Sequence, residues 1–155
     1  FGIHCGTGNA AIAILFRKPL LDLTATLHDL YTNFENSILL TKHYYDKNKR
    51  RNLTLKEILN FKFNEVRLRQ QFDEKNIEII DCTEDEIAEA ALELLDRLER
   101  KWIDSKEILD LQNKFKQHNW KGVIQEANGI KTNCHGKINA NYSSNYLIKN
   151  PNWLK

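Results

Sequence analysis

Short apolar runs and one apolar helical segment open the chain. Residues 1–5 and 20–23 have the length and composition of buried strands, and residues 10–16 between them suit a short helix. Gly6 and Gly8 supply a tight turn before that helix, and Pro19 ends it. This order predicts a βαβ unit with a parallel pair of strands. Because the helical segment is apolar nearly all round, we expect it to be buried.

Further along, the pattern predicts strands over residues 37–44 and 77–82, and a helix over 64–75. Two helices begin at capping boxes, Thr54 with Glu57 and Thr83 with Glu86. From Thr83 onward apolar residues recur at steps of three and four, which predicts one buried stripe on a long helix. Its members are Ile87, Ala91, Leu94, Leu98 and Trp102.

A further helix ends near Gln117, capped by Asp104 or Ser105, and the pattern then weakens. Glycine, asparagine and serine interrupt the remainder, with a short amphipathic turn expected over 142–147. We therefore predict a Rossmann-like α/β domain over residues 1–120, three-layered with a short parallel sheet. Residues 121–155 form a loop-rich tail, partly helical, that packs on this domain.

Composition agrees with a folded domain and excludes several classes of protein. The 155 residues are 41% hydrophobic and 28% charged, with a net charge of +2 that does not predict nucleic-acid binding. Three cysteines at wide spacing suggest free thiols in a reducing compartment. Cys82, Cys134 and His135 lack the spacing of a zinc site, so no metal is expected. The chain has no methionine and opens with Phe1, which suggests a fragment lacking an N-terminal part.

The turn around Gly6 and Gly8 is the strongest candidate for chemistry. Ligands bind at the carboxyl ends of parallel strands, where a glycine turn and the start of a helix favour phosphate. The candidate binding residues are His4, Gly6, Thr7, Gly8 and Asn9. A tight turn needed only for packing remains the alternative. Lys42, at the end of a predicted strand, could neutralise a diphosphate, or it could be a solvated lysine.

Two other chemical interpretations of this turn are open. Gly6-x-Gly8-x-x-Ala11 fits a dinucleotide fingerprint, but Asp22 comes earlier than the acidic residue of that motif. Cys5-Gly6-Thr7-Gly8 resembles a turn of one class of sugar-phosphate isomerases, in which the cysteine acts as a base.

A third resemblance spans most of the chain. The turn, followed by Leu15-Phe16-Arg17-Lys18-Pro19, resembles the donor site of two-Rossmann-domain (GT-B) glycosyltransferases, in a bacterial family associated with surface polysaccharides. Leu53-Thr54-Leu55-Lys56-Glu57-Ile58-Leu59 and Tyr146-Leu147-Ile148-Lys149-Asn150-Pro151 are similar to further motifs of that family. His4-Cys5 and Asn9 depart from its pattern.

The resemblance implies the C-terminal, donor-binding half of a GT-B enzyme that moves a sugar from a nucleotide to a polysaccharide or lipopolysaccharide acceptor. Its partners would be the nucleotide-sugar donor, a preceding Rossmann-like domain and a saccharide or lipid-linked acceptor. It implies no cofactor and no metal, because helix amides and basic side chains stabilise the leaving diphosphate. No catalytic residue is assigned. The expected location is the cytoplasm or the cytoplasmic face of the inner membrane.

Two alternatives to the transferase stay open. One is a non-catalytic α/β module that binds a nucleotide or a partner, and the other is a dinucleotide-dependent oxidoreductase. The basic run formed by Lys47, Lys49, Arg50 and Arg51 is expected to be a solvated hairpin, with contact to a membrane or polyanion as the alternative.

Overall fold

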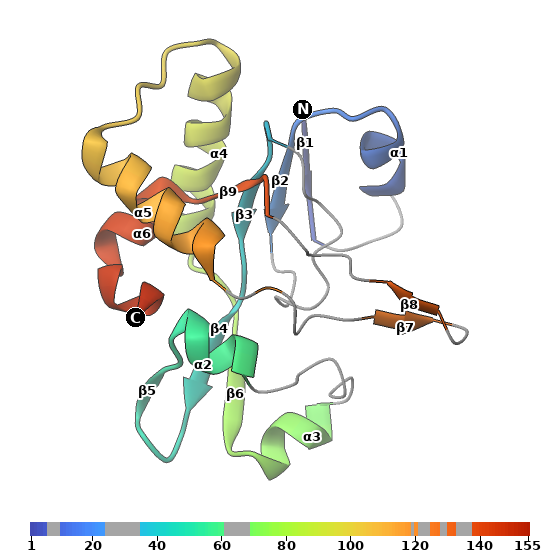
Figure 1. Ribbon diagram of the computed structural model, residues 1–155, viewed down its shortest axis with the longest axis vertical. Helices are drawn as coiled ribbons and strands as arrows, with labels where there is room; N and C mark the ends of the chain where they lie inside the picture. Colours follow the sequence, from blue (N-terminus) through green and yellow to red (C-terminus); the bar gives the residue numbers. More distant parts are fainter. Residues whose placement is uncertain are drawn as a thin grey trace.

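The protein is a mixed α/β structure built around a four-stranded parallel sheet, as the sequence predicts (Figure 1). The computed structural model describes residues 1–5, 10–23, 35–60, 69–118, 120, 125–127, 130–132 and 138–155. In the sheet the strands lie side by side in the order β1, β2, β3, β9, and all are parallel. Their bounds are Gly2–His4, Leu20–Leu23, Ile38–Leu40 and Asn141–Tyr142.

The β1–α1–β2 unit confirms the predicted opening of the chain. Helix α1 (Ala10–Leu15) links two strands whose register pairs Gly2 with Leu20 and His4 with Asp22. The expectation that this helix is buried is wrong. The side chains of Ile12, Leu15 and Phe16 are 65%, 78% and 66% exposed. The sheet ends at β1, so α1 covers an edge strand and only one side of the helix meets protein.

The long helix α4 (Glu84–Leu98) begins at the predicted capping box. The Thr83 hydroxyl accepts a hydrogen bond from the Glu86 amide, and the Glu86 carboxylate accepts one from the Thr83 amide. The predicted buried stripe is only partly right. Leu94 is buried, but Leu98 is 38% exposed, and the fully buried positions include Ala90 and Glu93. The buried face is rotated because a charged residue, Glu93, belongs to it.

Three more helical elements cover the sheet beside α4. They are α5 (Lys106–Gln117), α6 (Ser144–Lys149) and the 3-10 helix η3 (Pro151–Leu154). Ser105 is the cap of α5, since its hydroxyl accepts a hydrogen bond from the Ile108 amide. In Figure 1, α4, α5 and α6 lie to the left of the parallel strands and α1 lies to the right. Helices therefore flank the sheet on two sides.

A second sheet is antiparallel, with the strand order β5, β4, β6. The strand expected over residues 37–44 is wrong as one element: it divides at Thr41 and Lys42, so that β3 joins the parallel sheet and β4 joins this one. The remaining elements are β4 (His43–Asp46), β5 (Arg51–Asn52), α2 (Leu55–Asn60), α3 (Arg69–Glu74) and β6 (Ile77–Ile80), and a hairpin of β7 (Gln125–Ala127) and β8 (Ile130–Thr132). At Thr54 and Glu57 the second capping box is formed as predicted.

Aromatic rings from distant segments fill the core where the end of the chain meets the sheet. The Tyr142 ring lies 4.6 Å from Trp153 and 5.2 Å from Phe115, measured between ring centroids. Its hydroxyl is 2.9 Å from the Thr41 hydroxyl and accepts a hydrogen bond from the Thr41 amide. Burial raises the pKa of Tyr142 well above its usual value, so the phenol stays neutral. These contacts fix β9 beside β3.

Candidate functional site

The carboxyl edge of the parallel sheet carries a histidine and an aspartate on neighbouring strands. His4 ends β1, and Asp22 lies opposite it on β2. The His4 Nδ1 atom is 3.8 Å from the Asp22 Oδ1 atom, and their side chains are 7% and 1% exposed. A buried carboxylate is costly unless polar groups surround it, and the His4 imidazole is one such group beside Asp22. It stands where open α/β sheets bind ligands.

Sequence reasoning named His4 but considered Asp22 only as a dinucleotide-binding acid. A signal was present, because β2 reads Leu-Leu-Asp-Leu, with one charged residue inside a strand that is buried throughout. Neither Asp nor Glu is commonly fully buried without a partner. The order of strand, turn, helix and strand predicts that β1 and β2 are parallel. In a parallel pair of this length, Asp22 near the end of β2 lies close to the end of β1.

The glycine turn itself lies outside the described residues. Gly6, Thr7, Gly8 and Asn9, the other predicted binding residues of this turn, therefore have no structural outcome here. The structure does describe both ends of the turn. Cys5 is exposed with a free thiol, and α1 begins at Ala10. In sequence, residues 6–9 therefore connect Cys5, which follows the end of β1 at His4, to the start of α1.

Lys42 follows β3 at the same edge, but the structure does not bring it next to His4. Strand β2 lies between β1 and β3, so the backbones of these two strands are roughly 10 Å apart. The Lys42 ammonium is 2.6 Å from the carboxylate of Asp81, whose side chain is 75% exposed. Lys42 is therefore held in a surface ion pair, a position closer to the solvated-lysine interpretation than to a diphosphate contact.

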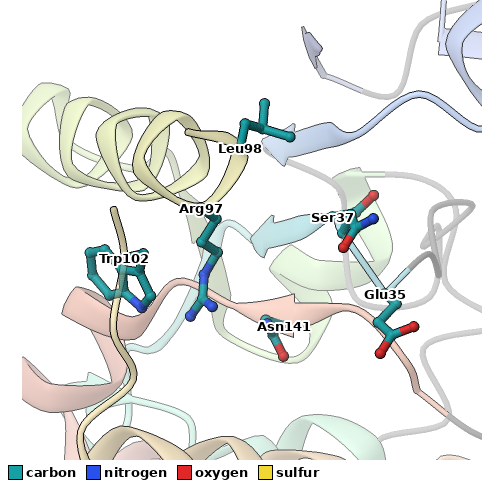
Figure 2. Close-up of a pocket in the computed structure, with 7 residues that line it drawn as sticks. Glu35, Ser37, Arg97, Leu98, Trp102 and Asn141 are labelled. Carbon is teal, nitrogen blue, oxygen red and sulfur yellow. The ribbon is translucent and has the colours of Figure 1, made fainter. Parts of the chain in front are cut away.

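At the opposite, amino edge of the sheet there is a pocket of about 200 Å³ (Figure 2). It is lined by Glu35, Asn36, Ser37, Arg97, Leu98, Trp102 and Asn141. Figure 2 shows the Arg97 side chain reaching from the end of α4 to a position between Trp102 and Asn141. Its guanidinium makes two hydrogen bonds to the Asp104 carboxylate, at 2.7 and 3.1 Å, and lies 5.1 Å from the centre of the Trp102 ring.

Three charged side chains at this pocket form one network, in which Arg97 is paired with both Glu93 and Asp104. Glu93 is fully buried and accepts hydrogen bonds from Arg97, from the Ser144 hydroxyl at 2.6 Å and from the Ser144 amide at 2.7 Å. Burial raises the pKa of Glu93 despite these bonds, whereas the hydrogen bond from Arg97 lowers the pKa of Asp104. Since Arg97 is bound by two carboxylates, the lining that the structure describes offers no ready cation for a phosphate.

A third cluster lies between the antiparallel sheet and the start of α4 and contains three types of metal-binding atom. His43 Nε2, Cys82 Sγ and a Glu86 carboxylate oxygen all lie within 4.8 Å of one another. Burial, with smaller contributions from Glu86 and Asp81, raises the pKa of Cys82 to about 12, so without a metal the thiol is protonated. Sequence reasoning grouped Cys82 with Cys134 and His135, which lie outside the described residues. The neighbours in the structure are Glu86, four residues further along on α4, and His43, which comes from the distant strand β4 and carries no sequence signal that links it to Cys82.

The basic run confirms the expected hairpin between β4 and β5. Lys49 and Arg51 both bind the Glu57 carboxylate, at 2.9 and 2.7 Å, and Lys47 is 3.5 Å from Glu78. Three of its four basic side chains thus have acidic neighbours within the chain. No helix in the described part of the chain has both the length and the apolar character needed to cross a membrane.

Comparisons with protein-family models, with curated proteins and with solved structures find no match to this chain. The function of this chain is therefore inferred from the residues of the site.

Proposed function

We propose that this chain binds a nucleotide-activated sugar at the carboxyl edge of its parallel sheet, as the donor-binding part of a glycosyltransferase. The observation that carries the proposal is the His4–Asp22 couple, which stands at the end of β1 directly before the glycine turn. The four-stranded parallel sheet with helices on two sides is compatible with the Rossmann-like half of a GT-B enzyme. The resemblance of the turn and its following segments to that family supports the same function.

The couple suits the chemistry of a leaving nucleoside diphosphate. Asp22 lies beside Nδ1 of the imidazole, so the ring is oriented with Nε2 on the side away from the carboxylate. When the imidazole is protonated, its Nε2–H can donate to a phosphate oxygen while Nδ1 faces Asp22, and the backbone of a glycine turn allows the phosphate to approach closely. A preorganised donor aimed at developing negative charge stabilises the transition state of the transfer.

The donor class also limits where the reaction would take place. Nucleotide sugars for surface polysaccharides are used at the cytoplasmic face of the inner membrane in the family that this chain resembles. We include that location, and a saccharide or lipid-linked acceptor, in the proposal. The sugar is transferred by breaking its bond to the diphosphate and forming one to an acceptor hydroxyl, whose proton leaves to a base not assigned here.

A ligand panel with edge variants tests the proposal. Thermal unfolding is followed with UDP, GDP, CDP, CMP, NAD and NADP. One nucleotide at about 100 times its dissociation constant should stabilise the protein by roughly 2.7 kcal/mol. His4→Ala and Asp22→Asn should each weaken that binding at least tenfold in titration calorimetry. His118→Ala is the matched control, because His118 binds the Leu154 carbonyl instead and should leave the affinity unchanged.

Two results would overturn the proposal. If folded His4→Ala binds the nucleotide as tightly as the unmodified chain, the couple is not part of the site. If only NAD or NADP stabilises the protein, the oxidoreductase interpretation replaces the transferase.

A further inference from the structure

We propose that His43, Cys82 and Glu86 bind a zinc ion that ties the antiparallel sheet to the start of α4. The three side chains come from the first residue of β4, the segment after β6 and the first turn of α4. Their ligand atoms lie within 4.8 Å of one another, and His43 Nε2 is 3.0 Å from a Glu86 carboxylate oxygen. The site does not belong to the carboxyl-edge couple, and it stands independently of the proposed transferase function.

The spacing of these atoms is close to what a tetrahedral ion requires. Two nitrogen or oxygen ligands at about 2.0–2.1 Å from zinc are roughly 3.3 Å apart, and a sulfur at about 2.3 Å lies slightly further from its neighbours. The His43–Glu86 pair already has nearly this separation. The sulfur needs to close by up to about 1.2 Å, which is within the reach of a change in a cysteine rotamer.

The combination of ligands selects the metal. A thiolate and an imidazole favour zinc and related transition metals, whereas magnesium and calcium prefer sites made of oxygen. Three protein ligands leave a fourth position for water or for another group. The cluster therefore has the ligand number of an open zinc site rather than of a closed four-ligand one.

Neighbouring contacts hold the ligands in place. The His43 ring stacks on Tyr146, with centroids 5.4 Å apart and planes 12° from parallel. The Glu86 carboxylate accepts a hydrogen bond from the Thr83 amide at 2.8 Å, an outer contact that orients it. Cys82 is buried, and its thiol donates to the Thr41 carbonyl at 3.3 Å. All three side chains are thus restrained before any ion arrives.

The surrounding charge also favours a cation. Asp81, Glu84, Asp85 and Glu86 stand close together in sequence around Cys82, and Lys42 is bound to Asp81. A divalent ion at the cluster would add positive charge to these acidic surroundings. The Cys82 thiol would lose its proton to solvent as the Zn–S bond forms, and His43 would bind through a neutral ring nitrogen.

Cobalt and zinc alone are the probes. The chain is stripped with a chelator, titrated with CoCl₂ and then with ZnCl₂, and bound metal is counted by mass spectrometry. We expect about one equivalent of metal and a near-ultraviolet sulfur-to-cobalt charge-transfer band that zinc abolishes. Cys82→Ser should lose the band and bind zinc at least tenfold more weakly, because even the loss of a residue that orients a ligand typically lowers metal affinity by this much. Cys5→Ser and Cys134→Ser are matched controls that should keep both.

Glu86→Gln keeps the thiol and guards against a folding defect in Cys82→Ser. It should retain the cobalt–sulfur band at higher metal concentration, with circular dichroism unchanged. Absence of the band from the unmodified chain would overturn the proposal. So would equal zinc affinity in Cys82→Ser and Cys5→Ser, or loss of the band in Cys134→Ser.

Discussion

The two edges of the parallel sheet use buried charge in opposite ways. At the amino edge, Arg97 donates hydrogen bonds to both Glu93 and Asp104, and Glu93 also accepts one from the Ser144 amide. Asp104 accepts a further hydrogen bond from the Trp102 indole, so each charge has more than one partner in good geometry. At the carboxyl edge, the His4 Nδ1 and Asp22 Oδ1 atoms are 3.8 Å apart, longer than a hydrogen bond. The first arrangement is a network of short hydrogen bonds that fixes how the helices pack, whereas the second lies at the strand ends where open α/β sheets bind ligands.

The comparison explains why a pocket alone does not identify the site. The described pocket lies at the amino edge, where Arg97 is held by carboxylates and by the Trp102 ring. A saturated network mainly fixes how α4, α5 and α6 pack together. Functional groups are better sought where titratable side chains meet at the carboxyl ends of parallel strands.

Removing the centre of the amino-edge network should cost the most stability. Glu93→Ala leaves Arg97 and the Ser144 amide without their buried partner, so the free energy of unfolding should fall by about 3–5 kcal/mol. Urea denaturation at pH 7 measures it. Glu89→Ala is the control on the same helix, because it breaks only an exposed pair with Lys149 and should cost within ~1 kcal/mol. Equal losses in both variants would contradict a structural role for the network.

Asp104→Asn should lower stability by about 2 kcal/mol at neutral pH, because it weakens charge-assisted hydrogen bonds from Arg97. The hydrogen bond from Arg97 lowers the pKa of folded Asp104 below its usual value of 3.8. The carboxylate therefore stabilises the fold above that pKa, and its contribution is lost as the pH falls through the lower folded value. Unfolding curves at pH 7 and at acid pH should show the gap between the two proteins closing. A gap independent of pH would count against the ion pair.

Glycine substitutions at two helix ends compare how strongly α1 and α4 are coupled to global folding. Arg17 follows α1 and Arg100 follows α4, with φ of 48° and 59°, in the left-handed region that favours glycine. Arg100→Gly should raise the free energy of unfolding by about 0.5–1 kcal/mol, since the strain relieved exceeds the entropy lost. Arg17→Gly should raise it less, because α1 lies on the edge strand. Lys101→Gly, outside that backbone region, should stabilise nothing; equal gains at all three positions would refute the argument.

The smallest effect should come from the exposed face of α1. Leu15→Gln changes a side chain that is 78% exposed, so the free energy of unfolding should move by no more than about 0.5 kcal/mol. Leu94→Gln, at a buried position of α4, should unfold or severely destabilise the protein. Thermal and urea denaturation measure both. Light scattering adds a second observable, since removal of an apolar surface group should reduce any self-association. A large loss of stability in Leu15→Gln would mean that α1 is covered by protein.

Local chemistry made much of this fold predictable. Both capping boxes depend on residues three positions apart, and both form as expected. The βαβ opening was also readable, because Gly6, Gly8 and Pro19 mark its boundaries in the sequence. Errors arose where a distant segment decides the outcome. The break after β3 depends on pairing of β4 with β6, and the two residues of β9 carry no pattern of their own.

The candidate sites divide in the same way. His4 could be proposed from its place before a turn, whereas its contact with Asp22 needed the register of two strands. Glu93 reads as a solvated helical residue until α6 places an amide beside it. His43, Cys82 and Glu86 belong to segments that only the antiparallel sheet and α4 bring together. Sequence spacing finds ligands on one turn or helix and misses those assembled by topology.

The position of β9 sets an order of events during synthesis. Thr41 and Tyr142, which bond across β3 and β9, are 101 residues apart. At roughly 5–20 residues per second, a ribosome needs about 5–20 s to make the segment between them. During that interval the apolar strand β3 has an open side that can pair with another nascent chain. Completion of the sheet is therefore delayed until Asn141 and Tyr142 emerge, and a chaperone that shields β3 in the meantime would raise the yield of folded protein.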